Sequence, residues 1–143
     1  KSALTGGEVV FKKLIDNNVK DVFIFSGGSV MPIIDPFYKN KKINYFVNTH
    51  EQNCGHAATG YAKLSGNPAV CLVTSGPGIT NMITPMLDAT NDSTPLVVIS
   101  GQVSLEAVGT NAFQEAPAVE LSKHVTKYSK QITSITRSAT GCN

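Results

Sequence analysis

One carboxylate stands at the start of a stretch rich in small residues. Glu51 begins the run EQNCGHAATGYAKLSG, which has helical character and follows a short apolar segment, residues 43–47. Glycine-containing turns follow two other apolar segments, at residues 26–29 and 74–78. Glycine lets a backbone approach a ligand closely, and an acid beside such turns can exchange a proton with that ligand. The residues therefore indicate a ligand site built around Glu51.

The same residues also allow structural interpretations. Asn48 and Glu51 have the spacing of a capping box, in which Asn48 would cap the helix and Glu51 would bond back to it. The Gly76-Pro77-Gly78 turn could simply begin a helix, because proline is favoured at the first helical position. Spacing alone does not decide between a ligand site and these alternatives, so both stay open at this point.

Other ligand-binding motifs fit this sequence poorly. His50 and His56 are six positions apart, so they lie on different faces of a helix and cannot share a metal as in H-E-x-x-H. The run GPGITN has Asn81 where a dinucleotide fingerprint needs its last glycine, and no G-K-[ST] follows. We therefore expect no metal ligands, no P-loop and no dinucleotide site.

Helices and strands must alternate to position these turns. Apolar patterns predict helices over residues 5–17, from about 29, over 48–65, from 76 to about 90 and over 117–125, and strands over 21–25, 43–47, 69–73, 96–99 and, at an edge, 128–132. Apolar strands separated by single helices favour parallel pairing with right-handed crossovers. The sequence predicts an α/β fold, doubly wound, with a mostly parallel sheet and helices on both faces. Ligands of such sheets bind outside the carboxyl ends of the strands.

Length and composition limit the class of protein. A chain of 143 residues with 41% hydrophobic residues can bury one domain core, and a net charge of +2 is too small for a nucleic-acid surface. No apolar run approaches the roughly 20 residues that span a membrane. Cys54, Cys71 and Cys142 show neither disulfide nor zinc spacing, which favours a reducing compartment. We expect a cytoplasmic protein, or one of an organelle such as a mitochondrion or plastid, without nucleic-acid or membrane partners.

Five segments, taken in order, resemble a known family. They are FSGGS, NTHEQNCGHAATGYAKLSG, VTSGPGITN, PLVVISGQV and GTNAFQE. Together they resemble the pyrimidine-binding domain of thiamine-diphosphate-dependent enzymes, and most of all that of acetolactate synthase large (catalytic) subunits. The resemblance extends from Thr5 to Tyr128 and implies a thiamine-diphosphate-binding fold with flavodoxin-like layering.

The resemblance also implies roles for individual residues. Glu51 corresponds to the glutamate that bonds the N1′ nitrogen of the cofactor's aminopyrimidine ring, and Gln114 corresponds to a second catalytic residue. Positions that line the cofactor pocket correspond to Gly27, Gly28, Thr74, Pro77, Asn81 and Phe113, the last beside Gln114 near the reacting centre. Ser26 and Ser104 depart from the family, which commonly has proline at both positions.

The implied activity is that of a much longer enzyme. Acetolactate synthases decarboxylate pyruvate and join the product to a second 2-keto acid, in branched-chain amino-acid biosynthesis. The family implies thiamine diphosphate, with Mg²⁺ and FAD held mainly by other domains, a homodimer or higher assembly, and a regulatory subunit. We expect residues 1–143 to be a single pyrimidine-binding domain, truncated at its C-terminal end and inactive alone, without the middle and diphosphate-binding domains.

Two alternatives remain at this point. The chain could come from another thiamine-diphosphate-dependent decarboxylase or carboligase, because substrate choice depends largely on other domains. It could also be a non-catalytic flavodoxin-like module for binding or dimerisation that keeps Glu51 only as a helix cap.

Overall fold

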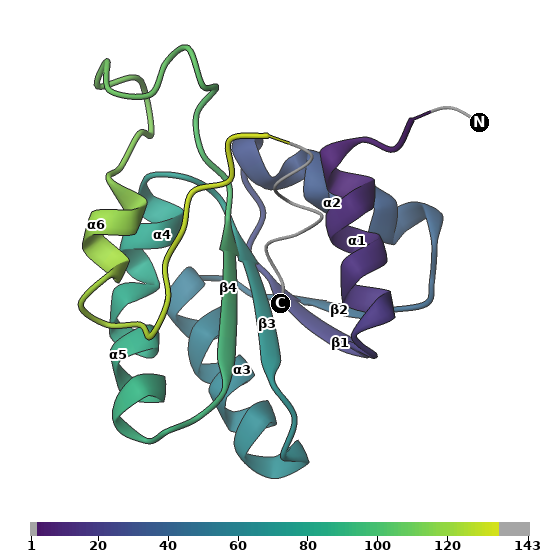
Figure 1. Ribbon diagram of the computed structural model, residues 1–143. Coiled ribbons are helices and arrows are strands. Elements are labelled where there is room, and N and C mark those ends of the chain that lie inside the picture. Colours follow the sequence, from purple (N-terminus) through teal and green to yellow (C-terminus); the bar gives the residue numbers. More distant parts are fainter. Residues whose placement is uncertain (1–2, 135–143) are drawn as a thin grey trace.

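Helices cover both faces of a four-stranded parallel sheet in the computed structural model, which describes residues 3–134 (Figure 1). The strands are β1 (Asp21–Ile24), β2 (Asn44–Val47), β3 (Ala69–Val73) and β4 (Leu96–Ser100). Their order is β2-β1-β3-β4, and all three neighbouring pairs are parallel. The predicted α/β architecture is confirmed.

Alternating side chains of the strands enter two separate cores. On one face of the sheet they pack under α1 (Gly6–Asp16) and α2 (Met31–Lys39), and this core includes Val22, Ile24, Val70 and Leu72. On the other face they pack under α3 (Glu51–Ser65), α4 (Pro77–Asn81) and α5 (Ile83–Asn91), and this core includes Phe23, Cys71 and Val73. A sheet apolar on both faces needs helices on both, which explains the near-continuous apolar runs of the sequence.

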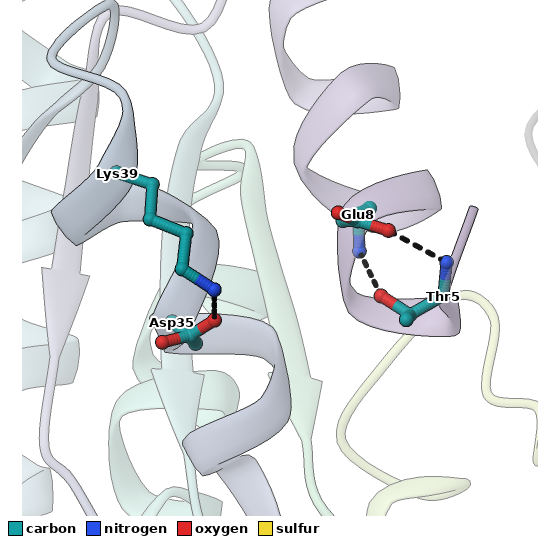
Figure 2. Close-up of polar contacts among 4 residues, drawn as sticks. All are labelled: Thr5, Glu8, Asp35 and Lys39. Carbon is teal, nitrogen blue, oxygen red and sulfur yellow. Dashed lines mark hydrogen bonds and ion pairs between the residues drawn. The ribbon is translucent and has the colours of Figure 1, made fainter. Parts of the chain in front are cut away.

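The first helix begins with a capping box formed by Thr5 and Glu8. Thr5 Oγ1 accepts a hydrogen bond from the Glu8 backbone N–H at 3.3 Å, and Glu8 Oε2 accepts one from the Thr5 N–H at 2.7 Å (Figure 2). This capping box lowers the pKa of Glu8, because both the backbone and the side chain of Thr5 hydrogen-bond to its carboxylate. A short 3₁₀ helix, η1 (Gly28–Val30), connects β1 to α2, and an exposed Lys39–Asp35 pair lies on the last turns of α2 (Figure 2).

Three of the predicted elements differ in the structure. The single helix expected from 76 to 90 is divided into α4 and α5, because Pro85 has no N–H to continue the hydrogen bonds of α4. The helix expected over 117–125 is the shorter α6 (Ala118–Ser122). Residues 128–132 form no strand, because Tyr128 and Ile132 are 68% and 54% exposed and therefore bury no apolar face.

Among residues 3–134, no helix combines the length and the apolar character that crossing a membrane requires.

The small residues of α3 serve the packing of this chain itself. A Cβ on Gly55 would lie 2.4 Å from Cγ of Pro85, so glycine allows α5 to approach α3 closely. Ala58 and Ala62 are also buried in the core beneath α3. The opposite face of the helix, which includes Ala57 and Gly60, is exposed.

Candidate functional site

The sheet order reverses between β1 and β3. From β1 the chain continues to β2 on one side, whereas β3 lies on the other side, so the loops after β1 and β3 diverge to opposite faces. Parallel α/β sheets bind ligands at this kind of switch point. The predicted glycine-containing turns, residues 26–29 and 74–78, lie at the carboxyl ends of these two strands.

Hydroxyl groups tie the two turns together. Ser29 Oγ lies 3.0 Å from Thr74 Oγ1 and accepts a hydrogen bond from the Ser75 N–H at 2.9 Å. A Cβ on Gly27 would lie 2.4 Å from the Cβ of Thr74, so glycine is required for this approach. Sequence reasoning did not assign a role to Ser29, although its place directly after two glycines at a strand end was a usable signal.

Glu51 is buried beside these turns. It is the first residue of α3 and is 5% exposed. Its Oε2 accepts a hydrogen bond from Nδ2 of Asn81, the last residue of α4, at 3.0 Å. Among the described residues, Oε1 has no hydrogen-bond partner. A buried carboxyl group with one oxygen bonded and the other free can share a proton with a ligand.

The capping-box interpretation of Asn48 and Glu51 is wrong. Nδ2 of Asn48 donates instead to the backbone oxygen of Phe46 at 3.1 Å. The N-cap of α3 is His50, whose Nδ1 accepts from the Gln52 N–H at 3.1 Å. Glu51 is therefore not used to cap its own helix, and its contact is with a different helix.

The third turn brings the long loop of residues 101–117 to the site. Gly76 has φ +59°, and a Cβ there would lie 2.7 Å from the backbone oxygen of Gln114. Gln114 itself has φ +59°, a left-handed conformation that is uncommon for residues other than glycine. The structure therefore brings the backbone of Gln114 to the Gly76 turn. The side chain of Phe113, by contrast, is 89% exposed.

Two polar side chains that sequence reasoning missed hold this loop. Gln102 donates from Nε2 to the Ala116 oxygen at 3.1 Å and accepts at Oε1 from the Val103 N–H at 2.9 Å. Glu115 accepts from the Ala112 N–H at 3.2 Å. Gln102 could have been found from its position directly after Gly101, which follows β4, and Glu115 from its place at the end of the segment GTNAFQE.

The remaining candidates border the crevice more openly. A Cβ on Gly28 would meet nothing within 4 Å, so there is open space next to that turn. Pro77 is the exposed first residue of α4. The buried thiol of Cys71 donates to the Cys54 oxygen at 3.6 Å, and contact with Cys54, followed by burial, raises its pKa well above the ordinary value. The Cys71 thiol therefore stays protonated and is no nucleophile.

Comparison with known proteins identifies the family. Residues 4–121 match the family model described as "Thiamine pyrophosphate enzyme, N-terminal TPP binding domain". The chain belongs to this family. The resemblance stated from the sequence is confirmed.

Acetolactate synthases are among the relatives that it matches. The chain is 46% identical over 132 residues to "Acetolactate synthase catalytic subunit, mitochondrial" of Saccharomyces cerevisiae, covering 92% of this chain and 19% of that protein. It is 45% identical over 130 residues to "Acetolactate synthase large subunit" of Corynebacterium glutamicum, covering 91% and 21%. The chain thus spans about a fifth of the length of these relatives.

The residues present fit the pyrimidine end of thiamine diphosphate. An aminopyrimidine offers ring nitrogens that accept hydrogen bonds, and Glu51 has a buried carboxyl group with one oxygen unbonded. Gly28 leaves open space next to the same switch point. Among residues 3–134, no group of three or more His, Cys, Asp or Glu side chains could hold a metal ion.

Proposed function

We propose that this chain is the pyrimidine-binding domain of a thiamine-diphosphate-dependent acetolactate synthase, in which Glu51 is the proton-transfer residue. The observation that supports this proposal most directly is the buried Glu51 carboxyl group at the switch point, bonded to Asn81 at one oxygen only. The reaction proposed is decarboxylation of pyruvate and carboligation to a second 2-keto acid. The relatives' names and their identity of about 45% favour it over another decarboxylase or carboligase.

The residues of this chain would bind and protonate the ligand rather than break bonds directly. When bound, thiamine diphosphate supplies the electron sink for cleavage of the bond next to a carbonyl group. Glu51 Oε1 would hydrogen-bond the ring nitrogen N1′ and hold the shared proton there. Because Glu51 is only 5% exposed, little water would compete for that proton, and the Ser29–Thr74 contact holds the adjoining turns together.

The other candidate residues keep more peripheral roles. We propose that Gly27, Gly28, Thr74 and Pro77 line the pyrimidine pocket, and that Asn81 lines it through its contact with Glu51. Gln114 and Phe113 would act near the reacting centre. The exposed Phe113 ring supports this role, because an apolar ring on a loop can cover a substrate or contact another domain.

The complete activity would need more protein than this chain. We propose that further domains of a longer enzyme hold the diphosphate through Mg²⁺, and also FAD, and that residues 1–143 alone are inactive. A homodimer is supported by the exposed face of α3, where Leu64 is 93% exposed beside Gly60. A regulatory subunit, and a mitochondrial rather than cytoplasmic location, are further proposals; the yeast relative is named as mitochondrial.

The experiment is an assay of the full-length enzyme that contains this domain, with pyruvate, thiamine diphosphate and Mg²⁺. We expect the wild type to form acetolactate, and Glu51→Gln to lower the turnover by about 10²–10⁴-fold, the range of general acid–base catalysis. Its melting temperature should not change, because the glutamine oxygen still accepts from Asn81. Exposed Glu120 provides the matched control, and Glu120→Gln should keep full activity.

Each contradiction has a distinct meaning. Full activity of Glu51→Gln would remove the proton-transfer role. A wild type that releases acetaldehyde or another product from pyruvate, and no acetolactate, would instead identify a different decarboxylase or carboligase.

A further inference from the structure

We propose that Asn81 is a positioning residue that assigns the two oxygens of Glu51 to different tasks. Oε2 is held as a hydrogen-bond acceptor, and Oε1 carries the proton that is shared with the ligand. This inference rests on the proposed function, because it concerns how the same carboxyl group meets the pyrimidine ring.

The Asn81–Glu51 contact makes the carboxyl group asymmetric. Nδ2 of Asn81 lies 3.0 Å from Oε2, and an amide nitrogen only donates hydrogen bonds. An oxygen that accepts this bond is disfavoured as the site of the carboxyl proton, because two hydrogens would then face each other. The proton is therefore favoured on Oε1, the oxygen without a partner among the described residues.

The imidazole ring of His50 lies near the same oxygen. Nδ1 of His50 accepts a hydrogen bond from the Gln52 N–H, which leaves Nε2 as the ring nitrogen without that bond. That Nε2 lies 4.0 Å from Oε2 of Glu51. His50 thus lies near Oε2 but beyond hydrogen-bond distance, and among residues 3–134 only Asn81 hydrogen-bonds this oxygen.

The fold of α4 does not itself require this amide. Asn81 ends the helix, and the C-cap is the next residue, Met82, which closes the turn through its own backbone N–H. In the described part of the chain, the Asn81–Glu51 bond is the one side-chain hydrogen bond between α4 and α3. Its chemical effect on Glu51 can therefore be tested separately from packing.

The test replaces the donor while keeping the size of the side chain. In the full-length enzyme, the dissociation constants of thiamine diphosphate and of its analogue with C–H in place of N1′ are compared for wild type, Asn81→Asp and Asn81→Leu. The wild type should prefer the natural cofactor. In Asn81→Asp an acceptor faces Oε2 and draws the Glu51 proton to that side, so the preference should fall by about 10–100-fold. Asn81→Leu should lose part of the preference for the natural cofactor.

If Asn81 served only in packing, Asn81→Leu would change the cofactor preference more than Asn81→Asp. If Asn81 only fills space, Asn81→Asp, which has the same shape, keeps the preference, and that result would overturn the inference. If Asn81→Asp does not fold, as measured by its melting temperature, an unchanged preference in Asn81→Leu overturns it instead. Asn53→Asp adds the same charge at an exposed position in the first turn of α3 and should not change the preference.

The Glu51→Gln variant distinguishes the two proposals. A wild type without preference, or a Glu51→Gln variant that keeps it, would overturn the proposed function and this inference together. A preference that is lost in Glu51→Gln and kept in Asn81→Asp would overturn this inference alone.

Discussion

The two ends of the sheet use polar side chains in opposite ways. At the carboxyl ends of the strands, Glu51, Thr74 and Ser75 are 5%, 4% and 3% exposed. At the amino ends, where the helices finish, the charged groups form ion pairs whose side chains are 46–73% exposed: Lys12–Asp16, Lys39–Asp35 and Lys63–Asp92. Buried polar groups destabilise a fold unless they are bonded, whereas exposed ion pairs change its stability little.

This difference supports the proposal that the ligand binds at the carboxyl end. Stability alone would be served by apolar side chains at the buried positions, because a satisfied buried polar group contributes little net free energy. The carboxyl end keeps a buried acid and buried hydroxyl groups nonetheless. We propose that ligand binding explains their presence at the switch point, whereas the amino end has the exposed ion pairs of an ordinary surface.

Two glycines with positive φ give the largest expected effect. Gly76, at the carboxyl end, has φ +59° and faces the Gln114 backbone, whereas Gly66, at the amino end, has φ +70° and open space around it. Gly76→Ala should lower the free energy of unfolding by roughly 2–5 kcal/mol, from backbone strain and overpacking together. Gly66→Ala should lower it by only about 1–2 kcal/mol. Urea unfolding of the two variants measures the difference.

Equal losses of the free energy of unfolding in these two variants would contradict the contrast between the two ends of the sheet. They would show that the Gln114 backbone moves away from an added methyl group without resistance. The loop of residues 101–117 would then not be held at the carboxyl end.

A hydroxyl and an ion pair test the same contrast with a smaller effect. Thr74→Val keeps the shape of the side chain and removes its contact with Ser29, so we expect a loss of about 1 kcal/mol in the free energy of unfolding. Lys63→Met removes the exposed pair with Asp92 and should produce no measurable change. Thermal unfolding of both variants checks this prediction, and a larger loss for Lys63→Met would reverse the contrast.

The last expected effect concerns a partly buried hydrogen bond at the amino end and depends on pH. Tyr61 donates to Asp21 Oδ2 at 2.9 Å, and this bond, together with burial and the Asp21 charge, raises the pKa of Tyr61 above its ordinary value of 10.0. A raised pKa in the folded state stabilises the protein below pH 10.0 and ceases to do so as pH rises through the raised value. The wild type should therefore have a higher free energy of unfolding than Tyr61→Phe at pH 8, and this difference should shrink above pH 10.

Urea titrations of both proteins at several pH values measure this narrowing. Because the Tyr61–Asp21 pair lies far along α3 from Glu51, cofactor binding by the full-length enzyme should be the same in both. A stability difference that stays constant up to pH 11 would contradict the role of this hydrogen bond.

Much of the fold could be predicted from local patterns. The strands β1, β2, β3 and β4 are short apolar runs bounded by turns, and burial on both faces makes such runs visible in a sequence. The boundaries failed where one residue changed the backbone hydrogen bonds, as Pro85 did between α4 and α5. The strand predicted for residues 128–132 is absent because an edge strand needs both a neighbouring strand and a buried face, and β-propensity indicates neither.

The sequence by itself determined the alternation of elements, the family and the place of Glu51 at a strand end. Only the tertiary structure decided what this acid contacts: the amide of Asn81, 30 positions later, and not a cap on its own helix. It also decided that the small residues Gly55 and Ala58 pack within the chain, and that Gln114 reaches Gly76. The reason is physical. Periodicity reports which face of an element is buried, whereas hydrogen-bond partners depend on which elements the sheet topology brings together.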